Sequence, residues 1–153
     1  MPFWKTAESE VTSTSKILTR FDKVSNLKEY FEKTKGMGVL ATADHAGKVN
    51  TAIYGRPHVG EGHNLAFIMT ERRSYTNVQQ NPHASYLFRE ESSGFSGVRL
   101  LLRKTGEENN PDRIKELMRR SYPPEDVGNL HLVHFNVEEV RPLVSSGKCP
   151  IEG

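Results

Sequence analysis

Short apolar runs joined by turns are the feature that most limits the fold of this chain. Runs with strand character are found at residues 38–43, 49–59, 64–69, 84–89, 98–104 and 130–140. A parallel pair of strands needs a crossover of about a dozen residues or more, usually a helix. Because most of these runs are joined by turns alone, the pattern predicts a mainly β fold, an antiparallel barrel or sandwich of about six strands with a few short helices.

Three segments outside these runs have helical character: residues 26–36, a segment that ends near Gln80, and residues 110–122. The last begins with Asn110-Pro111, the favoured order of an N-cap residue followed by a first-turn proline. We expect this helix to pack on the outside of the sheet. Its apolar stripe consists of Ile114, Leu117 and Met118.

A length of 153 residues fits one domain with a substantial core. Residues 1–24 are largely polar and are interpreted as an N-terminal arm, and residues 25–153 as a single domain. Phe67, Phe88 and Phe135 lie inside strand-like runs and are expected in the core.

Composition argues against several classes of partner. The net charge is only +2, so nucleic acid is not an expected partner. No apolar run approaches the roughly 20 residues of a membrane span, and no membrane partner is expected. The first residues lack the apolar core of a secretory signal, and Cys149 is the single cysteine. A reducing, cytoplasmic location is therefore the expectation.

The sequence predicts no metal site and identifies no catalytic acid, base or nucleophile. His131 and His134 are three residues apart on an expected strand, so their side chains point to opposite faces and do not chelate one metal together. Cys149 has no base supplied by any sequence feature, so it is interpreted as an incidental thiol.

The segment from Thr70 to Pro82 carries the strongest functional signal. Arg72 and Arg73 are followed by hydroxyl side chains in a strand-to-helix turn. Arginine offers a bidentate fork to phosphate, and a helix N-terminus offers free backbone N–H groups. The turn therefore indicates a ligand that bears a phosphate; the alternative is a helix start with a solvated basic surface.

The order of these elements resembles the FMN-binding split-barrel superfamily, which includes pyridoxamine 5'-phosphate oxidase and small bacterial FMN-binding proteins. The resemblance runs from about Leu27 to Val140, and it rests on residues 38–43, 47–52, 69–82 and 94–103. It implies an antiparallel six-stranded split β-barrel, FMN as cofactor and a homodimer.

The resemblance also implies positions for the cofactor. Arg73 and Ser74 would hold the FMN phosphate, Arg72 would assist, and Asn77 matches an asparagine of the small FMN-binding proteins. Asn50, Thr51 and Ala52 would present hydrogen bonds to the isoalloxazine ring, and Thr70 and Glu71 would line the floor of the site. The loop formed by Gly94, Phe95, Ser96 and Gly97 would approach the flavin near the dimer seam.

The function implied is that of an oxidoreductase in which FMN carries hydride or electrons between small-molecule donors and acceptors. Two alternatives stay open: a flavin-binding or flavin-sensing protein without turnover, and the same fold with the deazaflavin F420 or haem. Pyridoxamine 5'-phosphate oxidases bind the substrate phosphate with a basic C-terminal motif, which the tail at residues 141–148 does not reproduce. The resemblance therefore does not imply oxidation of vitamin B6.

Overall fold

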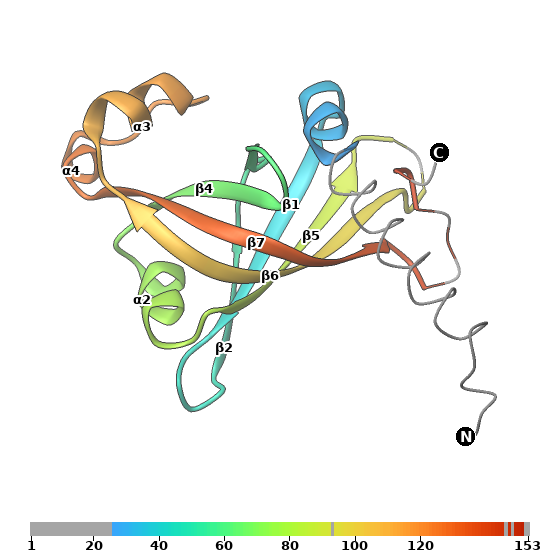
Figure 1. Cartoon of the computed structure of the whole chain (residues 1–153), viewed down its shortest axis with the longest axis horizontal. Coiled ribbons are helices and arrows are strands. Elements are labelled where there is room, and N and C mark those ends of the chain that lie inside the picture. Colours follow the sequence, from blue (N-terminus) through green and yellow to red (C-terminus); the bar gives the residue numbers. More distant parts are fainter. Residues whose placement is uncertain (1–25, 93, 146, 148, 152–153) are drawn as a thin grey trace.

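The computed structural model describes residues 26–92, 94–145, 147 and 149–151, so the expected arm at residues 1–24 lies outside the described part. Its strands form one antiparallel sheet in the order β2-β1-β5-β6-β7-β4-β3, and the sheet is strongly coiled (Figure 1). The strands are β1 Gly36–Ala43, β2 Val49–Ile53, β3 His58–Val59, β4 Asn64–Thr70, β5 His83–Glu90, β6 Gly97–Glu108 and β7 Leu130–Pro142. The antiparallel, mainly β prediction is confirmed.

The sheet has seven strands, and the prediction of about six was wrong because the run at residues 49–59 is two strands. Gly55 and Pro57 interrupt it, and proline has no N–H to give to a strand ladder. The two resulting strands, β2 and β3, lie at opposite edges of the sheet. Residues 54–57 connect these edges directly, which makes the coiled sheet a split barrel.

Short helices surround the barrel: residues 26–33, α2 Arg73–Gln80, α3 Pro111–Leu117 and α4 Pro124–Val127. The side chain of Asn110 accepts hydrogen bonds from the backbone N–H groups of Asp112 and Arg113 at 3.0 and 3.3 Å, as the capping pattern predicted. Two expected helix ends were wrong. The first helix stops before Gly36 because that residue begins β1, and α3 stops at Leu117 because Met118 has an extended backbone.

The core lies inside the barrel, with a second cluster outside it. Phe67, Phe88 and Phe135 are all buried, as expected, and the helix at residues 26–33 adds Leu27 and Phe31 to the same core. On the outer side, a separate cluster joins α3 to β4 and β7, which confirms that α3 packs outside the barrel. Its members include Ile114, Leu117, Met118, Ala66, Ile68, Leu130 and Leu132.

One outer face of the sheet is apolar and exposed within the described part of the chain. Leu101 is 41% exposed, whereas its neighbours Leu100 and Leu102 are buried. Ile53 on β2 and Leu87 on β5 both lie directly opposite Val39 on β1, so the three side chains form a row across three strands. We call the surface formed by Met37, Val39, Ile53, Leu87 and Leu101 the apolar outer face.

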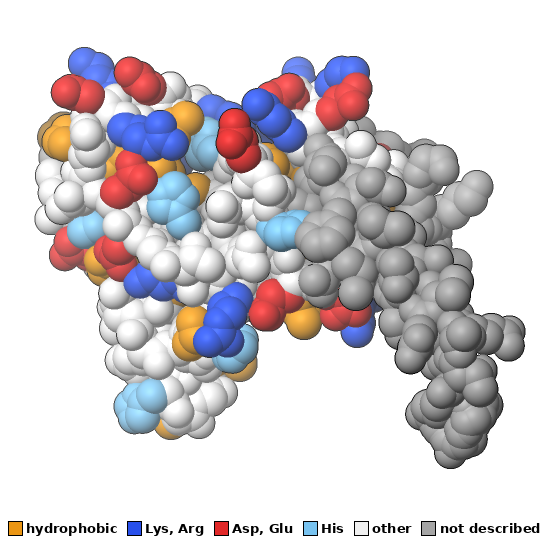
Figure 2. All heavy atoms as spheres, in the orientation of Figure 1, with side chains coloured by type: hydrophobic (Ala, Val, Ile, Leu, Met, Phe, Trp, Pro, Cys, Tyr) orange, Lys and Arg blue, Asp and Glu red, His pale blue; other side chains and the backbone are white. Residues whose placement is uncertain are grey.

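The surface elsewhere is mixed in charge. Figure 2 shows acidic and basic side chains interspersed over the described part of the face in view. Within the described residues, no helix is both long and apolar enough to span a membrane.

Candidate functional site

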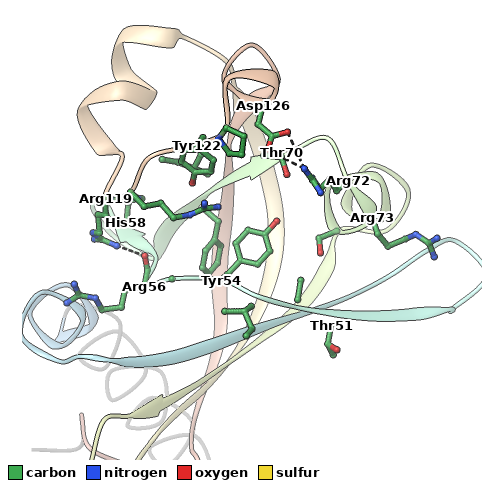
Figure 3. A pocket seen from close by; sticks show the side chains of 18 of the residues that line it. Thr51, Tyr54, Arg56, His58, Thr70, Arg72, Arg73, Arg119, Tyr122 and Asp126 are labelled. Atoms are coloured by element: carbon green, nitrogen blue, oxygen red, sulfur yellow. Dashed lines mark hydrogen bonds and ion pairs between the residues drawn. The ribbon is translucent and has the colours of Figure 1, made fainter.

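A pocket of about 830 Å³ opens between the β2 edge, the end of β4, the start of α2 and the segment that follows α3 (Figure 3). Its size is within the range of about 300–1,000 Å³ typical of small-molecule sites. The described residues that line it comprise five arginines, one aspartate, one histidine, two tyrosines and several small or apolar residues. They are Asn50, Thr51, Ala52, Ile53, Tyr54, Gly55, Arg56, His58, Phe67, Ile68, Thr70, Arg72, Arg73, Ser74, Arg119, Arg120, Tyr122, Pro123 and Asp126.

The start of α2 forms one end of the pocket and suits an anion. Among the described residues no side chain caps this helix, and its first turn contains no acidic residue. The N–H groups of the first turn and the positive end of the helix dipole are therefore available to an anion, because no capping or acidic side chain already occupies them. Ser74 is buried here, and the Asn50 amide donates to its hydroxyl at 3.4 Å, which joins β2 to α2.

The two arginines of this turn behave differently. Arg72 reaches across the pocket to Asp126, with an Nη2–Oδ2 distance of 3.3 Å, so part of its charge is already compensated. Arg73 is exposed, and its side chain points away from the centre of the pocket (Figure 3). Arg73 thus lies at the rim, where it forms no ion pair with any other described residue.

Tyr54 occupies the centre of the pocket. Its backbone oxygen and that of Gly55 accept hydrogen bonds from the buried Tyr86 hydroxyl at 3.1 and 3.0 Å, which fixes the link between β2 and β3. Its ring meets Phe67 edge to face, with 5.7 Å between centroids. Burial raises the pKa of Tyr54 to about 12, against an opposing hydrogen bond with Ser74, so the phenol is neutral at pH 7.

The other end of the pocket is basic and is built from two distant segments. Arg56 and His58 come from the β2–β3 link and β3, and Arg119, Arg120 and Tyr122 follow α3. The Arg120 guanidinium lies over the Tyr122 ring, 4.0 Å from its centroid. Burial, and then the charge of Arg119, lower the pKa of His58 to about 4, so its imidazole is neutral at pH 7.

The structure brings seven of the residues expected at the site into this pocket: Asn50, Thr51, Ala52, Thr70, Arg72, Arg73 and Ser74. Asn77 lies outside it, buried, where its amide donates to the Thr42 hydroxyl at 3.0 Å and holds α2 on β1. Glu71 also lies outside it, where its carboxylate is hydrogen-bonded to the His131 imidazole at 2.7 Å.

The loop with Gly94, Phe95, Ser96 and Gly97 does not line the pocket within one chain. Glycine is required at Gly97, because a Cβ there would lie 1.9 Å from the Phe88 carbonyl oxygen. Phe95 is 74% exposed, with the Arg89 guanidinium 5.4 Å from its ring centroid. A role for this loop beside a cofactor requires a second subunit, and it stays a prediction.

The sequence interpretation missed the basic end of the pocket. One local signal could have found it: the tetrapeptide Arg-Arg-Ser-Tyr occurs at residues 72–75 and again at residues 119–122. Arg72, Arg73 and Ser74 from the first copy and Arg119, Arg120 and Tyr122 from the second line the pocket.

The histidines of β7 contact glutamate side chains. His131 contacts Glu71 and stacks on Tyr75, whereas His134 pairs with Glu108 at 2.9 Å. Within the described ranges, no group of three metal-ligating side chains comes together.

Comparisons with known proteins show which solved structures this fold is similar to. No protein-family model matches the chain, and a search of curated proteins finds no match. Solved structures do match. An FMN-binding protein from Syntrophomonas wolfei subsp. wolfei superposes with a TM-score of 0.70 at 13% identity, over 91% of this chain and 98% of that one.

Two further structures extend the comparison. A putative pyridoxamine 5'-phosphate oxidase from Lactobacillus delbrueckii has a TM-score of 0.56 at 20% identity, over 80% of this chain and 94% of that one. The haem storage protein HutZ from Vibrio cholerae has a TM-score of 0.55 at 15% identity, over 77% and 92% of the two chains. The chain therefore has the fold of the FMN-binding split-barrel superfamily, to which pyridoxamine 5'-phosphate oxidase-like proteins belong.

Proposed function

We propose that this chain binds FMN in the pocket and acts as an oxidoreductase. The observation that carries the proposal is the uncapped start of α2, with Ser74 and two arginines, at one end of a pocket large enough for a cofactor. A phosphate is the ligand group that such a helix start favours. The fold shared with an FMN-binding protein supports a flavin as that ligand.

The residues present fit FMN. Ser74, the first-turn N–H groups of α2, Arg73 and Arg72 would hold the phosphate, and Asn50, Thr51 and Ala52 would lie along the ring. When bound, FMN supplies the capacity to accept and release hydride or electrons. The protein contributes position and environment: Tyr54 presents a neutral phenol at the centre of the pocket, and Phe67 packs against the Tyr54 ring.

The phosphate assignment predicts a selective loss in Arg73→Ala. Loss of one charge-assisted hydrogen bond corresponds to about a tenfold to hundredfold weaker affinity for FMN. Riboflavin, which lacks the phosphate, should bind parent and variant equally. Fluorescence titration with both ligands checks this, and an unchanged FMN affinity in a folded variant removes Arg73 from the phosphate site.

A second subunit would complete the site. Ile53 lies both on the apolar outer face and in the pocket lining, so the pocket opens beside that face. A two-fold pair that buries the face would cover Leu87 and Leu101 and close the open side of the pocket. The proposed form is therefore a cytoplasmic homodimer that exchanges electrons with small molecules.

Haem binding is the alternative that a specific observation favours. His58 lines the pocket with a neutral imidazole, the form in which histidine binds a metal, and HutZ shares the fold. F420 and a flavin-binding protein without turnover remain further alternatives. The absorbance spectrum of the loaded protein and the mass of the released ligand separate flavin, F420 and haem. Reduction by a nicotinamide dinucleotide followed by transfer to an acceptor separates an enzyme from a binding protein.

A further inference from the structure

The basic end of the pocket contains more positive charge than the FMN phosphate requires. Arg56, Arg119 and Arg120 lie there with His58, and we name these residues the distal arginine cluster. We propose that this cluster binds the anionic group of the substrate, a carboxylate or a phosphate monoester, while the start of α2 holds the cofactor phosphate. The proposal deepens the proposed function and rests on it.

The arginines of the cluster form no ion pair with a described carboxylate, although Glu32 is close enough to Arg119 to act on its pKa. Among the ion pairs of the described residues, none involves Arg56, Arg119 or Arg120, whereas Arg72 at the opposite end is paired with Asp126. Arg56 is half-buried, where an uncompensated charge is costly, whereas Arg119 and Arg120 are exposed at the pocket mouth. An anionic ligand would supply the missing charge.

Backbone oxygens hold the guanidinium groups in place. Arg56 donates to the carbonyl oxygens of Phe31 and Thr34 at 2.8 and 3.3 Å, at the end of the first helix. Arg119 in turn donates to the carbonyl oxygen of Arg56. A guanidinium has five N–H donors, so these bonds orient both groups and still leave donors for a ligand. Preorganised donors of this kind bind an oxyanion with little loss of side-chain entropy.

The two arginines are close enough to repel each other. Partial burial lowers the pKa of Arg119, and the nearby charge of Arg56 adds to the effect. An oxyanion between them would relieve this repulsion. His58 adds a neutral imidazole that can donate or accept one hydrogen bond without adding like charge.

The cluster is separate from the phosphate end. In Figure 3, Arg56, His58 and Arg119 lie on one side of Tyr54, and Arg72 and Arg73 lie on the other. An anion at the cluster would therefore not compete with a phosphate at α2, and the space around Tyr54 between them would hold the reacting parts of cofactor and substrate.

The test uses crossed variants of the full chain. Isothermal titration of the FMN-saturated protein with inorganic phosphate, and in a separate arm with acetate, measures the anion site. Arg119→Gln should weaken anion binding about tenfold to hundredfold and leave FMN affinity unchanged. Arg73→Gln should weaken FMN binding by a similar factor and leave anion binding unchanged. Lys115→Gln is the matched control, because it removes one charge from exposed α3 outside the pocket and should change neither affinity.

Each outcome decides the proposal. Stronger binding of phosphate than of acetate assigns a phosphate monoester, and the opposite order assigns a carboxylate. The proposal is wrong if the parent binds neither anion, if Arg119→Gln binds them as the parent does, or if Arg119→Gln loses FMN as strongly as the anion. If no FMN binds, the proposed function fails, and the same titrations of the Arg73→Gln apoprotein and of Arg73→Gln/Arg119→Gln still test the cluster.

Discussion

The protonation states of His58 and Tyr54 are set by their positions in the folded pocket. Histidine ordinarily titrates near 6.5, but partial burial beside Arg119 brings the pKa of His58 to about 4. Burial disfavours the phenolate of Tyr54 and raises its pKa to about 12. Both groups are neutral at pH 7, so the formal charge of the pocket is set by its arginines and Asp126.

The shift at His58 predicts a pH dependence of stability. Between about 6.5 and about 4 the unfolded chain binds a proton at this residue that the folded chain does not bind. The free energy of unfolding should therefore fall as the pH is lowered through that window, and be fully recovered above it. NMR should show the His58 imidazole titrating near 4, and His58→Asn should flatten this part of the pH profile in urea unfolding. An imidazole that titrates at its ordinary value would show that it is hydrated.

Some helices and strands are determined by neighbouring residues, whereas others depend on tertiary contacts. The strand at residues 98–104 and the capped start of α3 follow from neighbouring residues, and the structure has both where the pattern indicated. The position of α2 depends on tertiary contacts instead. Its hold on β1 comes from the buried hydrogen bond between Asn77 and Thr42, which are far apart in the sequence.

The cap of α3 gives a test at this scale. Asn110→Ala removes the acceptor for two backbone N–H groups and should lower the free energy of unfolding by about 0.5–2 kcal/mol. Asn109→Ala is the matched control, since the neighbouring side chain is exposed and does not cap the helix. Chemical denaturation of the three proteins measures the difference. Equal losses in both variants would contradict a specific role for the cap.

At the scale of the whole molecule, the single chain leaves a pocket and an apolar face side by side. Met37, Ile53, Leu87 and Leu101 are all more than 40% exposed and lie on strands that are neighbours in the sheet. Contiguous exposed apolar surface in a protein typically marks an interaction site. The homodimer proposed above would bury this face and place the edge of the pocket at the subunit boundary.

Dimerisation and FMN binding should therefore be coupled. FMN should shift a dissociating protein toward the dimer. Leu101→Glu should oppose association without unfolding the chain, because the side chain is already partly exposed. Sedimentation velocity at low concentration, with and without FMN, checks both effects. Val127→Glu, at an exposed site on α4, is the control for the FMN-free measurement. A monomer that binds FMN tightly without associating would show that the site is complete in one chain.

The sequence by itself determined the antiparallel class, most strand positions, the start of α3 and the basic turn at residues 72–74. These features depend on side-chain periodicity, turn residues and caps, which act over a few residues.

Only the tertiary structure decided what the pocket contains. Coiling of the sheet splits the run at residues 49–59 and joins its two edges through residues 54–57, which exposes Tyr54 and Arg56 to the pocket. Packing of α3 on β4 and β7 then carries Arg119 and Arg120 to the same place. Local patterns could not show this, because these contacts join segments about 60 residues apart and are set by long-range burial, not by neighbouring side chains.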